Sequence, residues 1–451
     1  MTFVLGISML INCSPKTKKA TLPLAPPQAF SDSGTEALPD RWWTVFGDTT
    51  MNALVDSALQ SNFNLATAWQ RLREAQAIVD RESSSLFPDL NAIFEGELRR
   101  PEFDDTERLE LGLTSQYEID LWGRIRSRIE AERYRERATF ADYQTAALSL
   151  SAEVVRTWYQ LIEAQNQLEL VEEQIETNEN VLNLIEARFG TGQIRSVDIL
   201  RQRQLLEATR EQKIAAESRI QVLQHQLVVL LGRPPQEKIE IVHKDLPELP
   251  PLPAMGIPME LVRRRPDVQR AYSQLQAADR DLASAISNQY PRLTLTASAS
   301  TRGESAGNLF QDFAGSFVGS LLAPLLDAGE RGAEVDRTKS VKQQRLYEYG
   351  QTILLSFQEV EDALIQEKKQ LERIRSLEQQ VGFARQSYEQ LRIEYFNGVS
   401  DYIDVLTALT DEQQLRRDRL SARLVLLEFR IALYRAMAGG FETGTEAEEE
   451  S

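Results

Sequence analysis

Cysteine and histidine are almost absent from this sequence of 451 residues, which holds one cysteine, Cys13, and two histidines, His225 and His243. A disulfide within the chain needs two cysteines, so none can form. The three residues do not stand at the spacing of zinc ligands. They also cannot supply a nucleophile, a base and a group that orients the base. We therefore predict no metal site and no enzymatic activity.

Nucleotide-binding motifs and long apolar runs are missing as well. Neither GxxxxGK[ST] nor GxGxxG occurs, so the sequence predicts no use of ATP, of a dinucleotide or of any other cofactor. No run of about 20 apolar residues exists, so no helix is predicted to span a membrane. The formal net charge of −17 argues against a nucleic-acid partner, because phosphate binding needs a basic face.

The N-terminal segment 1–13 is short and apolar and ends at Cys13. It resembles a bacterial lipoprotein signal, in which Cys13 would carry lipid, palmitate included, and become the mature N-terminus. No Lys or Arg precedes the apolar stretch, so an ordinary signal with an incidental cysteine is the alternative. Segment 14–50 is interpreted as a tether and anchor, in which Trp42 and Trp43 fix the leading chain to a helical body rather than bind a ligand.

The sequence contains one unit twice. Segments 51–232 and 257–438 match at an offset of 203 to 206 residues. The clearest matches are Phe87-Pro88-Asp89-Leu90 with Tyr290-Pro291-Arg292-Leu293, and Phe189, Gly192 and Asp198 with Tyr395, Gly398 and Asp404. We predict two structural repeats, 51–232 and 257–440, joined by a Pro-rich connector at 233–256. An acidic tail, 441–451, is predicted to be disordered.

Each repeat is predicted to contain a helix, two strands, a very long helix and a return helix. In the first repeat the long helix spans about Ile125–Phe189, and its apolar residues recur at the heptad spacing of a coiled coil. The seam comprises Val154, Thr157, Leu161, Ala164, Leu168, Val171, Ile175, Asn178, Leu182, Ile185 and Phe189. Such a helix is roughly 100 Å long. Glycine-containing turns precede the return helices, which are predicted at Val197–Leu231 and Ile403–Ala438.

Four segments alternate between apolar and polar residues, with the period of a strand. They are Phe94–Arg99, Leu109–Asp120, Leu293–Ser300 and Phe313–Leu321. The pattern is typical of a membrane barrel with one lipid-facing surface, although a half-buried soluble sheet shows it too. Polar segments 100–108 and 301–312 are predicted to be external loops. Four strands cannot enclose a wet lumen and about 12 can, so closure predicts a homotrimer.

Four stretches together resemble the outer-membrane factor family of TolC and OprM, in its lipoprotein branch. They are Arg41–Asp48, Phe189–Asp198, Arg263–Val268 and Tyr395–Asp404. The resemblance covers Pro39–Gly439. It implies a mainly α fold with a membrane β part: a trimeric 12-stranded β-barrel in outer-membrane lipid, continued into the periplasm by a long α-helical coiled-coil barrel. It also implies a periplasmic adaptor (a membrane fusion protein) and an inner-membrane resistance-nodulation-division transporter, which together open this passive duct.

The same resemblance implies two kinds of site. In the family, an acidic residue after the second helix turn lines a closed aperture, which here is Asp404, with Asp401 and Tyr402 beside it. Capping of the helix N-terminus is the alternative role for these carboxylates. Adaptor contacts fall on the helix tips, at Arg188, Gly190, Thr191, Gly192, Ser196, Asn397, Gly398 and Ser400. Arg263–Arg265 are interpreted as partners of acidic residues across a protomer contact.

Two other functions share parts of this pattern. An exit duct of a type I protein secretion system has the same fold, and a structural periplasmic coiled-coil scaffold would also show heptads. The lipoprotein-like start and the Trp42-Trp43 pair favour the exit channel of a tripartite efflux pump, whereas the scaffold leaves the four strands unexplained. The sequence does not name the cargo of such a pump.

Overall fold

The computed structural model describes Leu22 and residues 27–99, 106–239, 245–256, 258–304 and 307–443. Cys13 and the acidic residues at 446–450 lie outside the described residues, so lipidation and a disordered acidic end stay predictions. The elements in chain order are a 3-10 helix η1 (Trp42–Phe46), α1 (Thr49–Ser61), α2 (Phe63–Ser83), a 3-10 helix η2 (Ser84–Leu86), β1 (Asn91–Arg99), β2 (Thr106–Ile119), α3 (Arg124–Gly190), α4 (Ser196–Leu230), α5 (Pro258–Arg264), α6 (Pro266–Ser287), β3 (Arg292–Gly303), β4 (Asp312–Leu322), α7 (Glu330–Phe396) and α8 (Tyr402–Met437).

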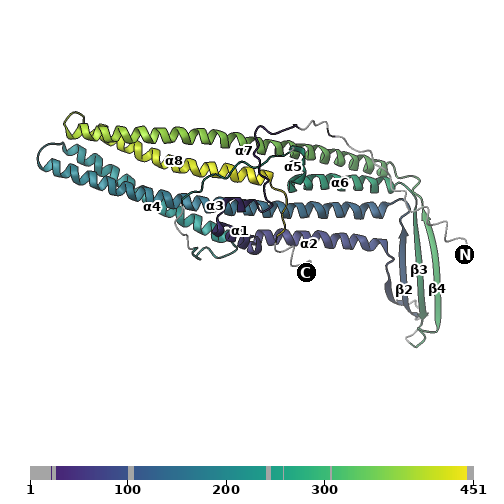
Figure 1. Ribbon diagram of the computed structural model, residues 1–451. Coiled ribbons are helices and arrows are strands. Elements are labelled where there is room, and N and C mark those ends of the chain that lie inside the picture. The colour runs from purple at the N-terminus through teal and green to yellow at the C-terminus, as the bar shows by residue number, and fades with distance from the viewer. Residues whose placement is uncertain are drawn as a thin grey trace. The chain divides into compact units, whose positions relative to one another are not determined.

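The order of elements is the same in both halves of the chain (Figure 1). Helices α3 and α7 each contain 67 residues, and the ends predicted for α3 are confirmed to within one residue. Most seam positions of α3 are buried or half-buried, as the heptad spacing predicts. Phe189 is the exception, with 45% of its surface exposed, because it lies in the last turn of the helix.

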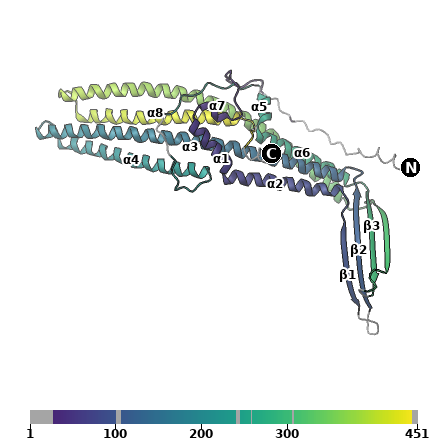
Figure 2. The same ribbon diagram turned by 60° about the horizontal axis from the view of Figure 1, so that its bottom comes forward.

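The chain divides into two compact units, and each contains residues from both repeats. Of the described residues, the first unit comprises Leu22 and those within 69–143 and 267–353, and holds the sheet. The second unit comprises those within 27–68, 144–266 and 354–443, and holds the return helices. Helices α3 and α7 contribute residues to both units. Within the second unit, α4 lies beside α3 and α8 beside α7 in both views (Figures 1 and 2).

The first unit holds one four-stranded antiparallel sheet in the order β1-β2-β3-β4 (Figure 2). Leu295 of β3 lies opposite Tyr117 of β2 and opposite Gly319 of β4. Apolar residues of neighbouring strands therefore share one face. On the other face Gln116 lies opposite Thr296. Cross-strand partners point to the same side of a sheet, so the predicted apolar and polar faces are confirmed. In the single chain the outer edges of β1 and β4 pair with no described strand.

The strands extend further than the sequence predicts. Strand β2 begins at Thr106 and β3 ends at Gly303. Both strands therefore extend into the segments predicted as external loops, 100–108 and 301–312. The added residues are mostly polar, so the alternation of apolar and polar residues does not identify them as part of a strand. The strand hydrogen bonds continue beyond the last apolar side chain, since a ladder needs backbone groups and not apolar residues.

The second unit has an aromatic core around η1. Trp42 and Trp43 are fully buried, with their rings 5.9 Å apart and nearly perpendicular. The indole nitrogen of Trp158 donates a 3.0 Å hydrogen bond to Asp48, whose carboxylate also caps α1 by accepting from the backbone of Thr50 and Met51. The tryptophan pair therefore anchors the leading segment, as predicted.

Two predictions for the second unit are wrong in detail. Phe441, assigned to a disordered tail, is buried with its ring 5.0 Å from that of Trp43, so the packed chain continues past α8. Arg265, expected to pair across a protomer contact, donates within the chain to Glu359 at 2.7 Å and to the carbonyl of Ala436 at 3.0 Å. The arginine is buried and needs its partners nearby, and α7 and α8 supply them.

Candidate functional site

The turns between long helices lie together in the second unit. The α3–α4 turn is residues 191–195, and the α7–α8 turn is residues 397–401. Gly192 and Gly398 have φ of 76° and 73°, the left-handed conformation that ends a helix at low cost for glycine. Arg188 joins the two turns: its guanidinium donates to the carbonyl of Phe396 at 3.3 Å and lies over the rings of Tyr395 and Phe396.

A polar cavity of about 450 Å³ opens between the two turns. Its lining includes six residues that the sequence singled out: Arg188, Asn397, Gly398, Ser400, Asp401 and Tyr402. Gly190, Thr191, Gly192, Ser196 and Asp404 are exposed outside that lining. The structure thus brings part of the predicted contact set and part of the predicted gate set into one place.

Asp401 and Asp404 have different surroundings at the start of α8. Asp401 is the N-cap residue but its side chain forms no capping hydrogen bond, and it lies 3.8 Å from the guanidinium of Arg195. Asp404, one turn on, is exposed, and its carboxylate has no hydrogen-bond or ion-pair partner among the described residues. Asp401 forms no side-chain cap, whereas Asp404 lies in the first turn of α8, where the helix N-terminus favours a carboxylate, so its position fits both of the roles predicted for it.

Tyr402 lies behind these aspartates and points into the protein. It is buried, and its hydroxyl donates a 2.5 Å hydrogen bond to the side chain of Gln202 in α4. Burial raises the pKa of the Tyr402 phenol, so the hydroxyl stays protonated and keeps donating. Within one chain Tyr402 fastens α8 to α4, and does not itself reach the surface that Asp404 occupies.

Buried amides continue this link along the helices. The side-chain nitrogen of Gln202 donates to the backbone carbonyl of Asn178 at 2.8 Å, and that of Gln413 donates to the Asn178 side chain at 3.1 Å. The Asn178 nitrogen in turn donates to Thr209 at 2.9 Å. Asn178 is a polar residue within the seam predicted for α3. The network explains it: a buried polar group needs partners, and it fixes the register of α3, α4 and α8.

Asp198 is a residue that the site prediction missed. It occupies in the first repeat the position of Asp404 in the second, yet only 3% of its surface is exposed. Its oxygens lie 3.6 Å from Arg195 and 3.5 Å from Arg201. The repeat alignment was the signal that could have identified it, because it equates the two aspartates. One aspartate is held between arginines while its counterpart is free and exposed.

The part of the chain that the structure describes contains neither a metal-binding cluster nor a membrane-spanning helix. No group of three or more His, Cys, Asp or Glu side chains there could hold a metal ion. Among the same residues, no helix carries an apolar stretch long enough to cross a bilayer.

A duplicated chain with two long helical hairpins and a four-stranded sheet of one apolar face defines a class of channel proteins of the outer membrane. Residues 54–233 and 257–439 match the model of the family described as outer membrane efflux protein. The chain therefore belongs to the outer membrane efflux protein family, and is an outer-membrane efflux channel.

Named relatives match along almost the whole chain. The pyoverdine export outer membrane protein OpmQ of Pseudomonas aeruginosa is 27% identical over 424 residues, covering 89% of this chain and 88% of OpmQ. The cation efflux system protein CusC of Escherichia coli is 25% identical over 446 residues, covering 96% of this chain and 97% of CusC. The toluene efflux pump protein TtgC of Pseudomonas putida is 27% identical over 468 residues, covering 100% of this chain and 96% of TtgC.

Solved structures show the same fold. The outer-membrane channel OprN superimposes with a TM-score of 0.84 at 28% identity, covering 95% of this chain and 98% of that one. The Campylobacter jejuni CmeC channel superimposes with a TM-score of 0.86 at 21% identity, covering 97% of this chain and 98% of CmeC.

Proposed function

We propose that three copies of this efflux channel close one 12-stranded β-barrel in the outer membrane, continued into the periplasm by a helical tunnel. The observation that carries the proposal is the sheet of the first unit. It has an apolar face, and among the described residues of the single chain neither β1 nor β4 has an outer neighbour. Unpaired backbone groups are costly in hydrocarbon, so these edges need partners, and further copies of the chain supply them.

The side chains of β4 support the same assembly. Every residue of this strand is exposed in the single chain, including Phe313 at 74% and Phe317 at 73%. A sheet of 11 to 14 residues per strand in β2, β3 and β4 is long enough to cross a bilayer when tilted. Lipid on one face and a wet lumen on the other account for both the apolar and the polar side.

The channel acts in a tripartite efflux pump, as a passive conduit with no catalytic step. A periplasmic adaptor engages the tips, at Arg188, Gly190, Thr191, Gly192 and Ser196 of the first repeat and Asn397, Gly398 and Ser400 of the second. An inner-membrane resistance-nodulation-division transporter supplies substrate and energy. The exposed glycines and the open cavity between the turns support this contact, because small residues allow another helical hairpin to approach closely.

Asp404 gates the periplasmic end, with Asp401 beside it. Three copies of an exposed, unpaired carboxylate at a narrow point form an acidic ring that attracts cations. Tyr402 supports that ring from behind through its bond to Gln202. The names of the relatives refer to pyoverdine, cations and toluene, so membership of the family leaves the cargo of this channel open.

The mature chain is anchored by lipid at Cys13. Replacement by alanine should abolish incorporation of labelled palmitate and leave the trimer intact, because the sheet provides the membrane contact independently of the anchor.

The assembly is tested on the full chain, purified in a neutral detergent. Native mass spectrometry should give three chains, and the same sample should form conducting, cation-preferring channels in planar bilayers. A water-soluble monomer without conductance would refute the proposal. In cells, deletion of the gene should raise susceptibility to at least one compound in a broad panel of drugs and metals.

A further inference from the structure

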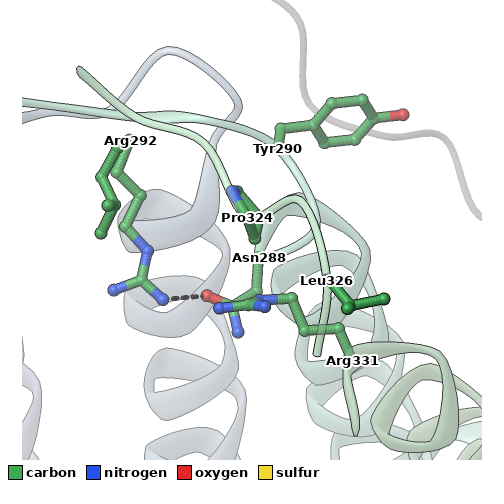
Figure 3. A pocket seen from close by; sticks show the side chains of 7 residues that line it. Asn288, Tyr290, Arg292, Pro324, Leu326 and Arg331 are labelled. Atoms are coloured by element: carbon green, nitrogen blue, oxygen red, sulfur yellow. Dashed lines mark hydrogen bonds between the residues drawn. The ribbon is translucent and has the colours of Figure 1, made fainter. Parts of the chain in front are cut away.

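A cavity at the base of the sheet, where strands end and helices begin, differs in charge between the two repeats. Both cavities lie in the first unit. The first-repeat cavity is lined by Arg124 and Arg128 and also by the carboxylates Asp89 and Glu118. The second-repeat cavity, of about 220 Å³, is lined by Arg292 and Arg331 with no carboxylate (Figure 3).

Two equivalent positions account for the difference: Glu118 of the first repeat corresponds to Pro324 of the second, and Asp89 corresponds to Arg292. Asp89 follows Phe87-Pro88 in the first repeat, and Arg292 follows Tyr290-Pro291 in the second. The position of a carboxylate in the first repeat is therefore occupied by a guanidinium group in the second. In the first-repeat cavity Arg124 also holds Glu118 at 2.7 Å, so its charges are balanced. Arg292 has no carboxylate partner among the described residues.

Two guanidinium groups converge in the second-repeat cavity. Arg292 donates a 2.5 Å hydrogen bond to the side-chain oxygen of Asn288, drawn as a dashed line in Figure 3, and Arg331 lines the same cavity. Arg331 is held at 2.8 Å by Asp327, yet its Nε is buried without a hydrogen-bond partner. Of the two guanidinium groups in the lining, only Arg331 is paired with a carboxylate, so the cavity has a surplus positive charge, which a phosphodiester would neutralise.

Apolar surface lies directly beside this charge. Leu325 and Leu326 are 94% and 95% exposed, and Leu326 lines the cavity together with Leu322, the last residue of β4. The ring of Tyr290, also in the lining, stacks on Trp122 at 4.9 Å. Aromatic residues at this level are typical of the boundary between hydrocarbon and water.

We propose that this cavity binds one anionic phospholipid per chain, with the phosphate on Arg292 and Arg331 and an acyl chain along Leu325 and Leu326. The proposal rests on the membrane placement of the sheet given above. A phosphate alone would leave the leucines in water, and an apolar partner alone would leave the guanidinium groups without an anion. A phospholipid satisfies both in one molecule.

The test uses the full trimer in a neutral detergent and counts bound phosphatidylglycerol by native mass spectrometry. We expect up to three lipids per trimer. Arg292→Gln and Arg331→Gln should each weaken binding roughly tenfold, since each loses a charge-assisted bond to phosphate. Arg302→Gln, at the other end of β3 and paired with Glu110, and Arg128→Gln, in the balanced cavity, are the matched controls and should bind as the wild type does.

Two outcomes would overturn the proposal. Millimolar inorganic phosphate that displaces the lipid, together with unchanged binding by Leu325→Ser/Leu326→Ser, would assign the cavity to free phosphate. Dissociation of the Leu325→Ser/Leu326→Ser trimer, with unchanged lipid binding by both arginine variants, would assign the leucines to contact between copies. Conductance of the wild-type protein is measured in planar bilayers alongside. If the wild type conducts, only the lipid site is refuted; if it does not conduct, the proposed channel itself is refuted.

Discussion

At the scale of single residues, the duplicated aspartates carry the most information about function. Asp198 is held between arginines of the first tip, whereas Asp404 is exposed and unpaired. A buried, compensated carboxylate serves the fold, and a free one at an equivalent position can serve a passing ion. The repeat thus provides an internal comparison between a buried aspartate that serves the fold and an exposed one for which we propose a role in the gate.

We expect Asp404→Ala to raise single-channel conductance in planar bilayers and to lower the preference for cations. The substitution shortens the side chain at the proposed gate and removes one negative charge per copy. Thr407→Ala is the matched control: it lies one turn further on, is exposed and uncharged, and bonds only to the carbonyl of Ile403. Unchanged conductance and selectivity in the Asp404 variant would remove this residue from the gate.

Glu412 in α8 should make stability depend on pH. Burial raises the pKa of its carboxyl, Arg416 lowers it and the neighbouring Glu173 raises it again, with a net increase. A raised pKa in the folded state means that the contribution of Glu412 to stability is present below the unfolded pKa and is lost as pH rises through the folded pKa. The group therefore destabilises the fold at neutral pH.

Glu412→Gln should consequently raise the thermal unfolding midpoint at pH 7.5 and change it less at pH 4. Both unfolding curves are measured by circular dichroism in the same detergent. Glu389→Gln, at an exposed carboxylate of α7 paired with Arg385, is the control. Equal shifts at the two pH values would contradict the assignment to Glu412.

At the scale of elements, the helical hairpins depend on two turns and one buried network. The turns need glycine because their φ values are positive, and the network of Asn178, Gln202, Gln413 and Tyr402 sets which residues of α3, α4 and α8 face each other. An apolar seam alone permits sliding by whole heptads, whereas paired amides accept a single register.

Gly192→Ala should destabilise the first hairpin by about 1 kcal/mol, through backbone strain alone. A Cβ at this position would meet no atom within 4 Å, but the φ of 76° is unfavourable for alanine. Gly190→Ala is the control two residues earlier. It also meets nothing within 4 Å and has no positive φ, so it should be neutral or slightly stabilising. Chemical denaturation of the two variants measures the difference, and equal stabilities would contradict the strain.

At the scale of the whole molecule, contacts between segments far apart in the sequence stabilise each unit. In the first unit the indole nitrogen of Trp122 donates to the carbonyl of Pro291 at 2.8 Å. In the second, the buried Arg430 of α8 holds Glu367 of α7 with two hydrogen bonds, of 2.7 and 2.6 Å. Arg430 also donates to the carbonyl of Pro251 at 3.0 Å, so it ties the connector between the repeats to the helices.

Arg430→Met should destabilise the fold by about 3–5 kcal/mol, because it leaves the carboxylate of Glu367 buried without its partner. Adding Glu367→Leu should recover much of that loss, since the unpaired charge is then gone. Arg416→Met, which removes a more exposed pair with Glu173, should cost under about 1 kcal/mol. Failure of the double variant to recover stability would show that the connector contacts matter more than the charge pair.

The sequence by itself determined the local elements of this protein. Heptad spacing, strand alternation and glycine turns placed the long helices, return helices and strands to within a few residues, because these signals act over a few positions of the chain. The repeat and the specific stretches around Trp42, Arg265 and Tyr395 also sufficed to place it in its family.

Only the tertiary structure decided how equivalent residues differ. Asp198 is buried whereas Asp404 is exposed, and Tyr402, predicted beside Asp404 at the gate, is buried. Sequence alone does not give these differences, because exposure depends on neighbours from distant parts of the chain. The pairing of Arg265 within the chain and the surplus charge around Arg292 have the same origin. The partner of Arg265 is more than 90 residues away in sequence, and the cavity around Arg292 is built from several elements. No local sequence pattern predicts such contacts.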